Sequence, residues 1–271
     1  MSKGFKLLRV EYIFSVLIPC LLSIYLNGYD IGSQIWILAG FAFYAITGNT
    51  LNDIIDMKDP NEKETLERVE GYGRKEIAVL AMASFLLGTM CFLNDLLTKP
   101  ILGIYLALIV FMVVFYCKFK KLVIINHIIL GISHIILPYF MIKINAGDVF
   151  MNIFPEMGLF ESLILAAITS VAFTGQMVHE MIDGDSLAKL EPRNSQLVIW
   201  IACLISLLIS VISFIITEKW IFLPILFFPF GIMYLYRKPR TDLLGRTSLK
   251  DTGIILGNLM LAYLIILILA P

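Results

Sequence analysis

The chain has 271 residues, of which 59% are hydrophobic and only 15% are charged, and its mean hydropathy is +0.88. A soluble globular protein cannot bury this much apolar surface, so the composition predicts an all-α integral membrane protein. The 21 basic and 21 acidic side chains cancel to a formal net charge of zero, which gives no support for a nucleic-acid partner.

Nine apolar segments approach the length of roughly 20 residues that a helix needs to cross a bilayer. They lie at about residues 12–28, 34–54, 76–94, 101–117, 122–142, 159–182, 197–216, 219–236 and 253–270. We therefore predict nine transmembrane helices in a single domain over residues 1–271. Because the second and sixth segments end in similar acidic clusters, we expect two four-helix halves plus one further helix.

The basic residues predict the orientation of these helices. If the N-terminus is cytoplasmic, every Lys and Arg except Lys99, Lys143 and Lys219 falls in a cytoplasmic segment. This bias follows the positive-inside rule. It predicts that the N-terminus and both acidic clusters lie on the cytoplasmic side, with the C-terminus outside.

The two acidic clusters are the best indication of function. They read Asn49-Thr-Leu-Asn52-Asp53-Ile-Ile-Asp56-Met-Lys-Asp59 and Gln176-Met-Val-His179-Glu180-Met-Ile-Asp183-Gly-Asp185. An aspartate costs roughly 2.5–3.5 kcal/mol at the centre of a membrane and less near its surface, so several acids on a membrane helix usually mark a functional site. Residues three and four apart share a helix face, so each cluster predicts one polar stripe.

Stripes of carboxylate and amide oxygens are suited to Mg²⁺, which prefers oxygen ligands and is often held by one or two carboxylates together with substrate phosphates. Two facing stripes would bind a diphosphate through Mg²⁺. We expect loop cations to offset the remaining phosphate charge. The candidates are Arg68, Lys118, Lys120, Lys121, Lys189 and Arg193.

Other interpretations of the polar residues stay open. An acidic run at a helix end is often a solvated interfacial cap, and membrane acids also relay ions, although such acids usually lie nearer the midplane. His127 and His134 in the fifth segment are expected to be packed or hydrogen-bonded core residues and not metal ligands.

Several stretches resemble one known family. Gly48-Asn49-Thr-Leu-Asn52-Asp53-Ile-Ile-Asp56 resembles the first aspartate-rich motif, NDxxDxxxD, of the UbiA superfamily of intramembrane prenyltransferases. The second acidic cluster is similar to the second motif of that family. Leu8-Arg9 before the first helix, and Tyr116 followed by Lys118 after the fourth, resemble the family as well.

The resemblance implies helices around a central cavity open to lipid, Mg²⁺ held by both motifs, and a polyprenyl diphosphate ionised to an allylic cation that an acceptor attacks. It implies catalytic roles for Asp53, Asp56 and Asp183. Together with the oxygen chemistry it predicts as metal ligands Asn52, Asp53, Asp56, Asp59, Glu180, Asp183 and Asp185. The predicted diphosphate-binding residues are Asn49, Arg68, Lys118, Lys120, Lys121, His179, Lys189 and Arg193.

Both motifs depart from the family at their last acid. The family pattern would place acids at positions 60 and 187, which are Pro60 and Leu187, and the nearby acids Asp59 and Asp185 come earlier in the chain. Either local loop geometry lets these two acids reach the same metals, or the site has been altered for another reaction.

The leading hypothesis is therefore a Mg²⁺-dependent prenyltransferase that uses an aromatic or lipid acceptor. A membrane terpene cyclase, in which the cation folds back on its own alkenes, is the alternative. A cation-coupled transporter or an inactive binding protein is a third hypothesis, because a fold does not determine a function.

Overall fold

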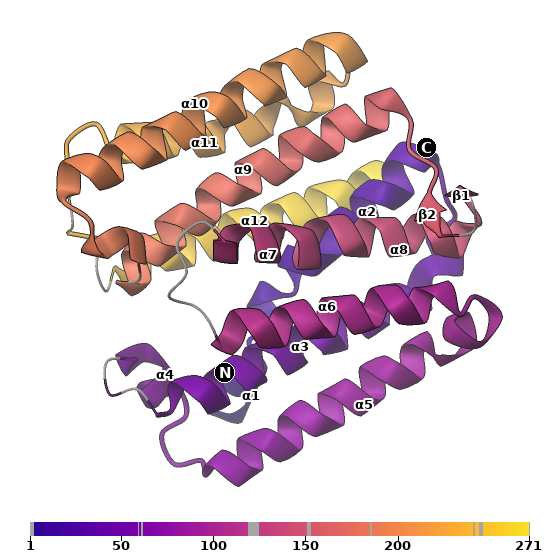
Figure 1. The fold of residues 1–271 in the computed structure, drawn as a ribbon, viewed down its shortest axis with the longest axis horizontal. Coiled ribbons are helices and arrows are strands. Elements are labelled where there is room, and N and C mark those ends of the chain that lie inside the picture. The colour runs from indigo at the N-terminus through magenta and orange to yellow at the C-terminus, as the bar shows by residue number, and fades with distance from the viewer. Residues whose placement is uncertain are drawn as a thin grey trace. The chain divides into compact units, whose positions relative to one another are not determined.

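The computed structural model describes residues 3–58, 60, 62–118, 125–150, 153–184, 186–240, 242–243 and 246–270, and these residues are almost entirely helical (Figure 1). The α-helices are α1 (Lys3–Leu8), α2 (Phe14–Asn27), α3 (Ile35–Asp56), α4 (Lys63–Arg68), α5 (Arg74–Thr98), α6 (Ile101–Lys118), α7 (Ile125–Gly131), α8 (Leu137–Ala146), α9 (Leu159–Asp183), α10 (Pro192–Thr217), α11 (Phe227–Leu235) and α12 (Thr247–Leu269). Shorter helical segments are η1 (Val10–Tyr12), η2 (Gly32–Gln34), η3 (Ile132–Ile136), η4 (Ser186–Lys189) and η5 (Trp220–Leu226), and η3 is a π-helix. In the described residues the strands are β1 (Val149–Phe150) and β2 (Phe154–Pro155), which pair antiparallel.

The predicted all-α membrane fold is confirmed in its main features. The described residues of each of the nine predicted segments are mostly helical, and among the described residues seven helices are long and apolar enough to cross a membrane. The two segments outside this set are α3, whose second half is rich in polar side chains, and the shorter stretch Trp220–Leu235. A count of nine crossings therefore stays a prediction, as does the central cavity.

The chain divides into two compact units, and this division differs from the expected halves. The first unit comprises Met1–Phe119, Ile132–Glu156 and Leu256–Pro271, and the second comprises Lys120–Gly131 and Met157–Ile255. The fifth and ninth predicted helices are each shared between the units. The fifth predicted helix is divided because its parts pack against different helices. Its α7 lies against α9 of the second unit, whereas η3 and α8 lie against α2 of the first.

Within the first unit, α3 packs along α5, and two glycines let their backbones approach closely. A Cβ atom added at Gly88 would lie 2.4 Å from Cδ1 of Tyr44 and 3.1 Å from the carbonyl oxygen of Gly40. One added at Gly40 would lie 2.7 Å from the ring of Phe92. Small residues at helix contacts are typical of membrane proteins, where close packing replaces the hydrophobic effect. This contact fixes α3, which carries the first acidic cluster.

We expect Gly88→Ala to lower the free energy of unfolding by about 1–3 kcal/mol, because the added methyl group overpacks the α3–α5 contact. Gly103→Ala in α6 is the matched control, since its nearest neighbouring atom would be Leu96 Cδ2 at 3.7 Å. The measurement is thermal unfolding of both variants in the same detergent. Equal melting temperatures for the two variants would contradict this account of the contact.

In the second unit, α9 packs along α10 through small polar residues. Ser206, Ser210 and Ser213 are all fully buried on one face of α10. The hydroxyl of Ser213 donates to the carbonyl of Leu163 at 3.0 Å, and the hydroxyls of Ser170 and Ser206 lie 3.2 Å apart. These contacts hold α9, whose C-terminal end carries the second acidic cluster.

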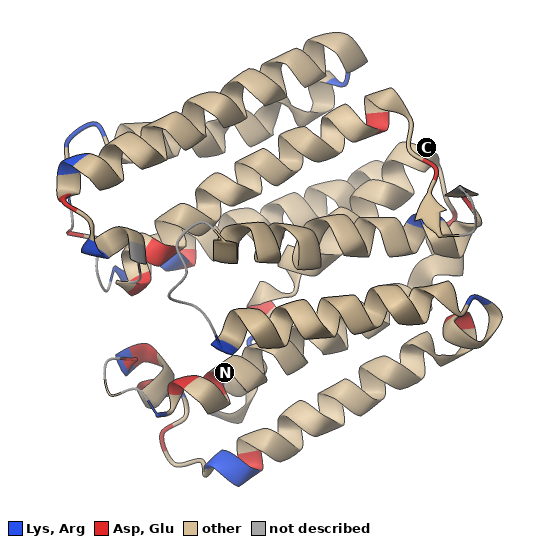
Figure 2. Ribbon diagram, viewed as in Figure 1, with Lys and Arg blue, Asp and Glu red and all other residues tan. Residues whose placement is uncertain are grey.

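In both units the Lys, Arg, Asp and Glu residues lie mostly near the ends of the helices, and the middles of the long helices carry few of them (Figure 2). Many large apolar side chains on the outer faces of α5, α6, α10 and α12 are exposed, such as Val79, Phe111 and Leu208. Exposed apolar helix faces between charged ends are typical of helices that contact lipid.

Candidate functional site

The last turn of α3 buries two carboxylates of the first acidic cluster. Asp53 is 0% exposed and Asp56 is 6% exposed. Asn49, Asn52 and Asp56 follow the spacing of three and four residues that places side chains on one face, as the sequence predicted. The helix ends at Asp56, so the remaining acid of this cluster lies beyond its regular part.

Arg68 of α4 holds Asp53 through both carboxylate oxygens. Its Nε donates to Oδ2 at 3.1 Å and its Nη2 donates to Oδ1 at 2.7 Å, with a further bond from Nη2 to the hydroxyl of Thr65 at 3.1 Å. Burial favours a lower pKa for Arg68, but the hydrogen bonds and charge of Asp53 outweigh it and raise that pKa, so the guanidinium stays charged. Arg68 was predicted to bind diphosphate and Asp53 to bind a metal. In the structure these two side chains form a bidentate ion pair with each other.

A second arginine contributes to this ion pair. Arg9 Nη1 lies 3.6 Å from Oδ1 of Asp53, and its guanidinium covers the ring of Tyr12 at 4.4 Å. Arg9 has a left-handed backbone, with φ of 47°, and its carbonyl oxygen accepts a hydrogen bond of 3.4 Å from Asn49. The N-terminal segment is therefore tied to α3 through both its side chain and its backbone.

Asn52 and Asp56 form the part of the cluster that is suited to a cation. The amide nitrogen of Asn52 donates to Oδ2 of Asp56 at 2.7 Å. Among the described residues, the amide oxygen of Asn52 has no hydrogen-bond partner although it is buried. A buried acceptor without a donor is uncommon in folded proteins and indicates an ordered water, an ion or a ligand. This oxygen, beside the Asp56 carboxylate, matches the oxygen ligands that Mg²⁺ prefers.

The second acidic cluster lies at the end of α9, which stops at Asp183 because Gly184 has a φ of 79°. Asp183 Oδ2 lies 2.9 Å from Nδ1 of His179, one helical turn earlier, and its Oδ1 accepts from Nζ of Lys250 at 3.0 Å. The side chain of Asp183 is 27% exposed. Its partner Lys250 was not a predicted site residue, and no local sequence pattern links two residues so far apart in the chain.

Glu180, the other predicted metal ligand on α9, lies near His127 on α7. Oε1 of Glu180 lies 3.5 Å from Nδ1 of His127 on α7, and the Glu180 side chain is 13% exposed. His127 is 2% exposed and its ring lies 5.1 Å from that of Phe173. His127 is thus packed, as expected, and its ring lies close to Glu180, which is a predicted metal ligand.

The remaining predicted site residues are either exposed or lie outside the residues that the structure describes. Lys118 at the end of α6, Lys189 in η4 and Arg193 at the start of α10 are exposed. Asp59, Lys120, Lys121 and Asp185 lie outside the described residues. Their predicted roles therefore stay predictions.

Positions 60 and 187, where the family pattern would place the last acid of each motif, differ in their surroundings. Pro60 is exposed beyond the end of α3. Leu187 is 1% exposed in an apolar cluster with Met181, Ile199 and Tyr236. An ionised carboxylate at position 187 would have no compensating charge in that cluster, whereas the apolar side chain of Leu187 packs there without cost.

The described residues contain no group of three or more His, Cys, Asp and Glu side chains that could hold a metal by themselves. The donor chemistry nevertheless fits Mg²⁺, because a Mg²⁺ site usually takes only one or two carboxylates and completes its ligands with water and substrate phosphates. In the first unit, Asn52 and Asp56 on α3 can supply such oxygens. In the second unit, considered by itself, Asp183 on α9 can supply a carboxylate.

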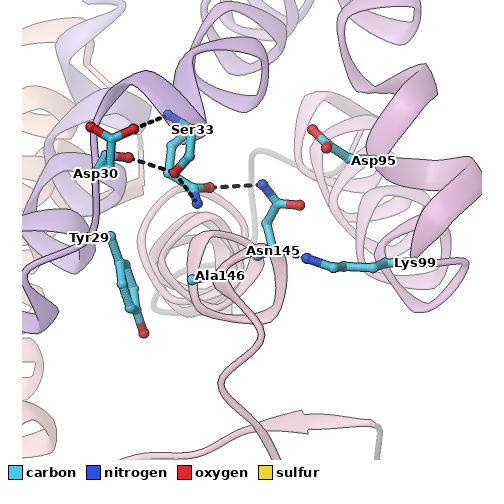
Figure 3. Close-up of a pocket in the computed structure, with 8 residues that line it drawn as sticks. Tyr29, Asp30, Ser33, Asp95, Lys99, Asn145 and Ala146 are labelled. Carbon is cyan, nitrogen blue, oxygen red and sulfur yellow. Dashed lines mark hydrogen bonds between the residues drawn. The ribbon is translucent and has the colours of Figure 1, made fainter.

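One cavity in the first unit lies away from both acidic clusters. It has a volume of about 370 Å³ and is lined by residues that include Gln34, Asp95, Lys99 and Asn145 (Figure 3). Gln34 precedes the first residue of α3, so this cavity is at the opposite end of α3 from Asp53. Most of its lining side chains are polar, which does not match the apolar surface that an isoprenyl chain requires.

The chain is similar to known proteins over most of its length. The family model for the UbiA prenyltransferase family matches residues 16–247. A structure of a UbiA homolog from Archaeoglobus fulgidus bound to GPP and Mg²⁺ has a TM-score of 0.71 and 14% identity, covering 98% of this chain and 99% of that chain. A structure concerning digeranylgeranylglyceryl phosphate synthase in membranes has a TM-score of 0.61 and 14% identity, covering 100% of both chains. No curated protein sequence matches the chain.

Proposed function

The chain belongs to the UbiA prenyltransferase family, and we propose that it transfers an isoprenyl group from a polyprenyl diphosphate to an aromatic or lipid acceptor in a Mg²⁺-dependent reaction. The observation that carries this proposal is the buried amide oxygen of Asn52, which has no hydrogen-bond partner in the described part of the chain and lies beside the carboxylate of Asp56. It supplies oxygen ligands at the position where the family motif begins. The similar structure from Archaeoglobus fulgidus, which is bound to GPP and Mg²⁺, supports the same substrate class.

Each residue of the first cluster has its own role in this proposal. Asn52 and Asp56 hold one metal, and Asp53, through its ion pairs with Arg68 and Arg9, fixes the end of α3 on which the other two depend. In the second unit, considered by itself, Asp183 of α9 is a candidate carboxylate ligand, and His179 and Lys250 hold it in place. Asp59, Glu180 and Asp185 remain candidate ligands.

The proposed chemistry is ionisation of the carbon–oxygen bond of the isoprenyl diphosphate, followed by capture of the allylic cation. Mg²⁺ held by Asn52 and Asp56 would supply positive charge that offsets the negative charge of the departing diphosphate. The exposed cations Lys118, Lys189 and Arg193 add positive charge near the helix ends. By the positive-inside bias we place the site on the cytoplasmic side of the membrane.

The experiment uses the purified full chain with Mg²⁺ and isoprenyl diphosphates of several lengths, with and without a panel of acceptors, and identifies the organic products by mass spectrometry. An alkylated acceptor is the expected product. A cyclised hydrocarbon formed without any acceptor would identify a terpene cyclase instead. Intact diphosphate at every chain length would contradict both.

A further inference from the structure

The polar cavity of the first unit is formed where three parts of the chain meet. They are the connection that leads into α3, the C-terminal end of α5 and the C-terminal end of α8. Its volume of about 370 Å³ lies within the range of about 300–1,000 Å³ that is usual for small-molecule sites. The cavity is therefore large enough for a polar headgroup and not only for a single ion.

Hydrogen bonds fix one wall of this cavity. Asn145 Nδ2 donates to Oε1 of Gln34 at 2.9 Å, and Gln34 is 2% exposed. Nζ of Lys99 donates to the carbonyl oxygen of Asn145. Because its amide nitrogen is bound to Gln34, Asn145 presents its amide oxygen on the side of Asp95 and Lys99 (Figure 3). The wall thus offers an oriented hydrogen-bond acceptor.

Asp95 and Lys99 bring opposite charges to the same wall. They lie one helical turn apart at the end of α5, but the side chain of Lys99 turns to Asn145. In the described part of the chain, the Asp95 carboxylate has no hydrogen bond and no ion pair with another side chain. A carboxylate without a partner, an amide oxygen and a nearby ammonium are complementary to a ligand that carries a cationic donor group and an anionic group.

The surroundings of the cavity indicate that this ligand is a lipid. Trp36, two residues after Gln34, is 62% exposed, and Leu97, between Asp95 and Lys99, is 74% exposed. Tryptophan is enriched where a membrane meets water. Asp95 lies in the last turn of α5, which is long and apolar enough to cross a membrane. This pattern indicates that the cavity lies at the level of the lipid headgroups.

We propose that this cavity binds the headgroup of a phospholipid that carries ethanolamine. The ammonium of the headgroup donates to the Asp95 carboxylate and to the amide oxygen of Asn145, and its phosphate pairs with Lys99. A choline headgroup has no N–H group to donate, and a glycerol headgroup has no positive charge, so both bind more weakly. This inference goes beyond the proposed prenyl transfer and does not depend on it.

The test compares short-chain lipids that differ only in the headgroup. The purified full chain in detergent micelles is titrated with dihexanoyl phospholipids of ethanolamine, choline or glycerol, and with free phosphoethanolamine, and the melting temperature is measured at each concentration. Asp95→Asn removes the carboxylate charge and keeps the shape of the side chain, whereas Asp95→Glu keeps the charge. Asp251→Asn is the matched control, because Asp251 is an exposed aspartate of α12 in the second unit.

We expect the ethanolamine lipid to raise the melting temperature of the wild type saturably, with an apparent Kd about tenfold or more below that of the choline lipid, the effect of a hydrogen bond to a charged group. Asp95→Asn should bind the two lipids equally. Asp95→Glu and Asp251→Asn should keep the preference. Without lipid, Asp95→Asn should melt close to the wild type, because its carboxylate has no side-chain partner to lose in the described part of the chain.

Three results would overturn the inference. The first is a wild type that binds the ethanolamine and choline lipids equally, and this comparison holds even if a variant fails to fold. The second is an Asp95→Asn variant that keeps the preference for ethanolamine, since the ammonium would then bind elsewhere. The third is free phosphoethanolamine that binds as tightly as the lipid, since the ligand would then be a soluble zwitterion.

Discussion

Replacing Asp53 with alanine is expected to lower the free energy of unfolding by about 3 kcal/mol. The substitution leaves the guanidinium of Arg68 without its bidentate partner and weakens the hold on Arg9. Breaking a buried ion pair typically costs 3–5 kcal/mol, because the remaining charge is left uncompensated, and the 17% exposure of the Arg68 side chain places this case at the lower end. The measurement is reversible unfolding in mixed micelles.

The double variant Asp53→Ala with Arg68→Leu separates stability from activity. Removing both charges should recover most of the lost stability, since a buried pair can be replaced by apolar groups at little cost. Activity should stay low, because α3 loses its link to α4 and to the N-terminal segment. If Asp53→Ala alone were as stable as the wild type, the ion pair would not hold the end of α3.

Replacing Asp56 with asparagine should lower the rate of prenyl transfer by about 100-fold or more while leaving the stability nearly unchanged. The amide keeps the shape and can still accept the hydrogen bond from Asn52, but it removes the negative charge that binds the metal. Losses of about 10²–10³ are typical when one electrostatic group of an active site is removed. Steady-state transfer rates, with melting temperatures measured in parallel, check this prediction.

Asp30→Asn is the matched control for Asp56→Asn. Asp30 is an exposed aspartate near the opposite end of α3, where its carboxylate accepts a hydrogen bond from the backbone of Ser33. The control should transfer prenyl groups at the wild-type rate. A similar loss in both variants would point to a general effect of charge, and an active Asp56→Asn would remove Asp56 from the site.

The fold was largely predictable because it depends on local patterns. Apolar segments of the length of a bilayer predicted the helices, and α9 ends at Asp183, close to the end of the predicted segment 159–182. The number of membrane crossings was harder to predict. The second half of α3 contains the polar residues of the candidate site, and these lower its hydropathy below that of the other long helices. The division into units was not predictable, since it depends on which helices α7 and α8 pack against.

The candidate site was predictable in its residue types and not in its pairings. Helical spacing placed Asn52 and Asp56 together on α3. The partners of the acids came from distant parts of the chain, as with Lys250 at Asp183 and Arg9 at Asp53, and no local pattern reports such contacts. His127 was expected to be a packed or hydrogen-bonded core residue, and a single histidine in an apolar segment gives no sign of the Glu180 carboxylate that lies 3.5 Å from its Nδ1.

The second motif has Leu187 where the family pattern carries its last acid, and the packing of this residue gives a physical reason for the difference. Leu187 is packed in the core of the second unit, and the hydroxyl of Ser195 donates to its carbonyl oxygen at 2.8 Å. A carboxylate there would be buried without a compensating charge. Whether Asp185 replaces it is tested by Asp185→Asn, which should lower the transfer rate if Asp185 is a ligand and leave it unchanged if Asp183 acts alone.

The central claim is that this chain ionises an isoprenyl diphosphate with the help of Mg²⁺, and phosphorus NMR of the released diphosphate tests it most directly. The purified wild type is incubated with isoprenyl diphosphates of increasing chain length, with Mg²⁺ or with excess EDTA. We expect release with Mg²⁺, none with EDTA, recovery when Mg²⁺ is restored, and almost none for Asp56→Asn. No release at any chain length, or release that EDTA leaves unchanged, would contradict the claim.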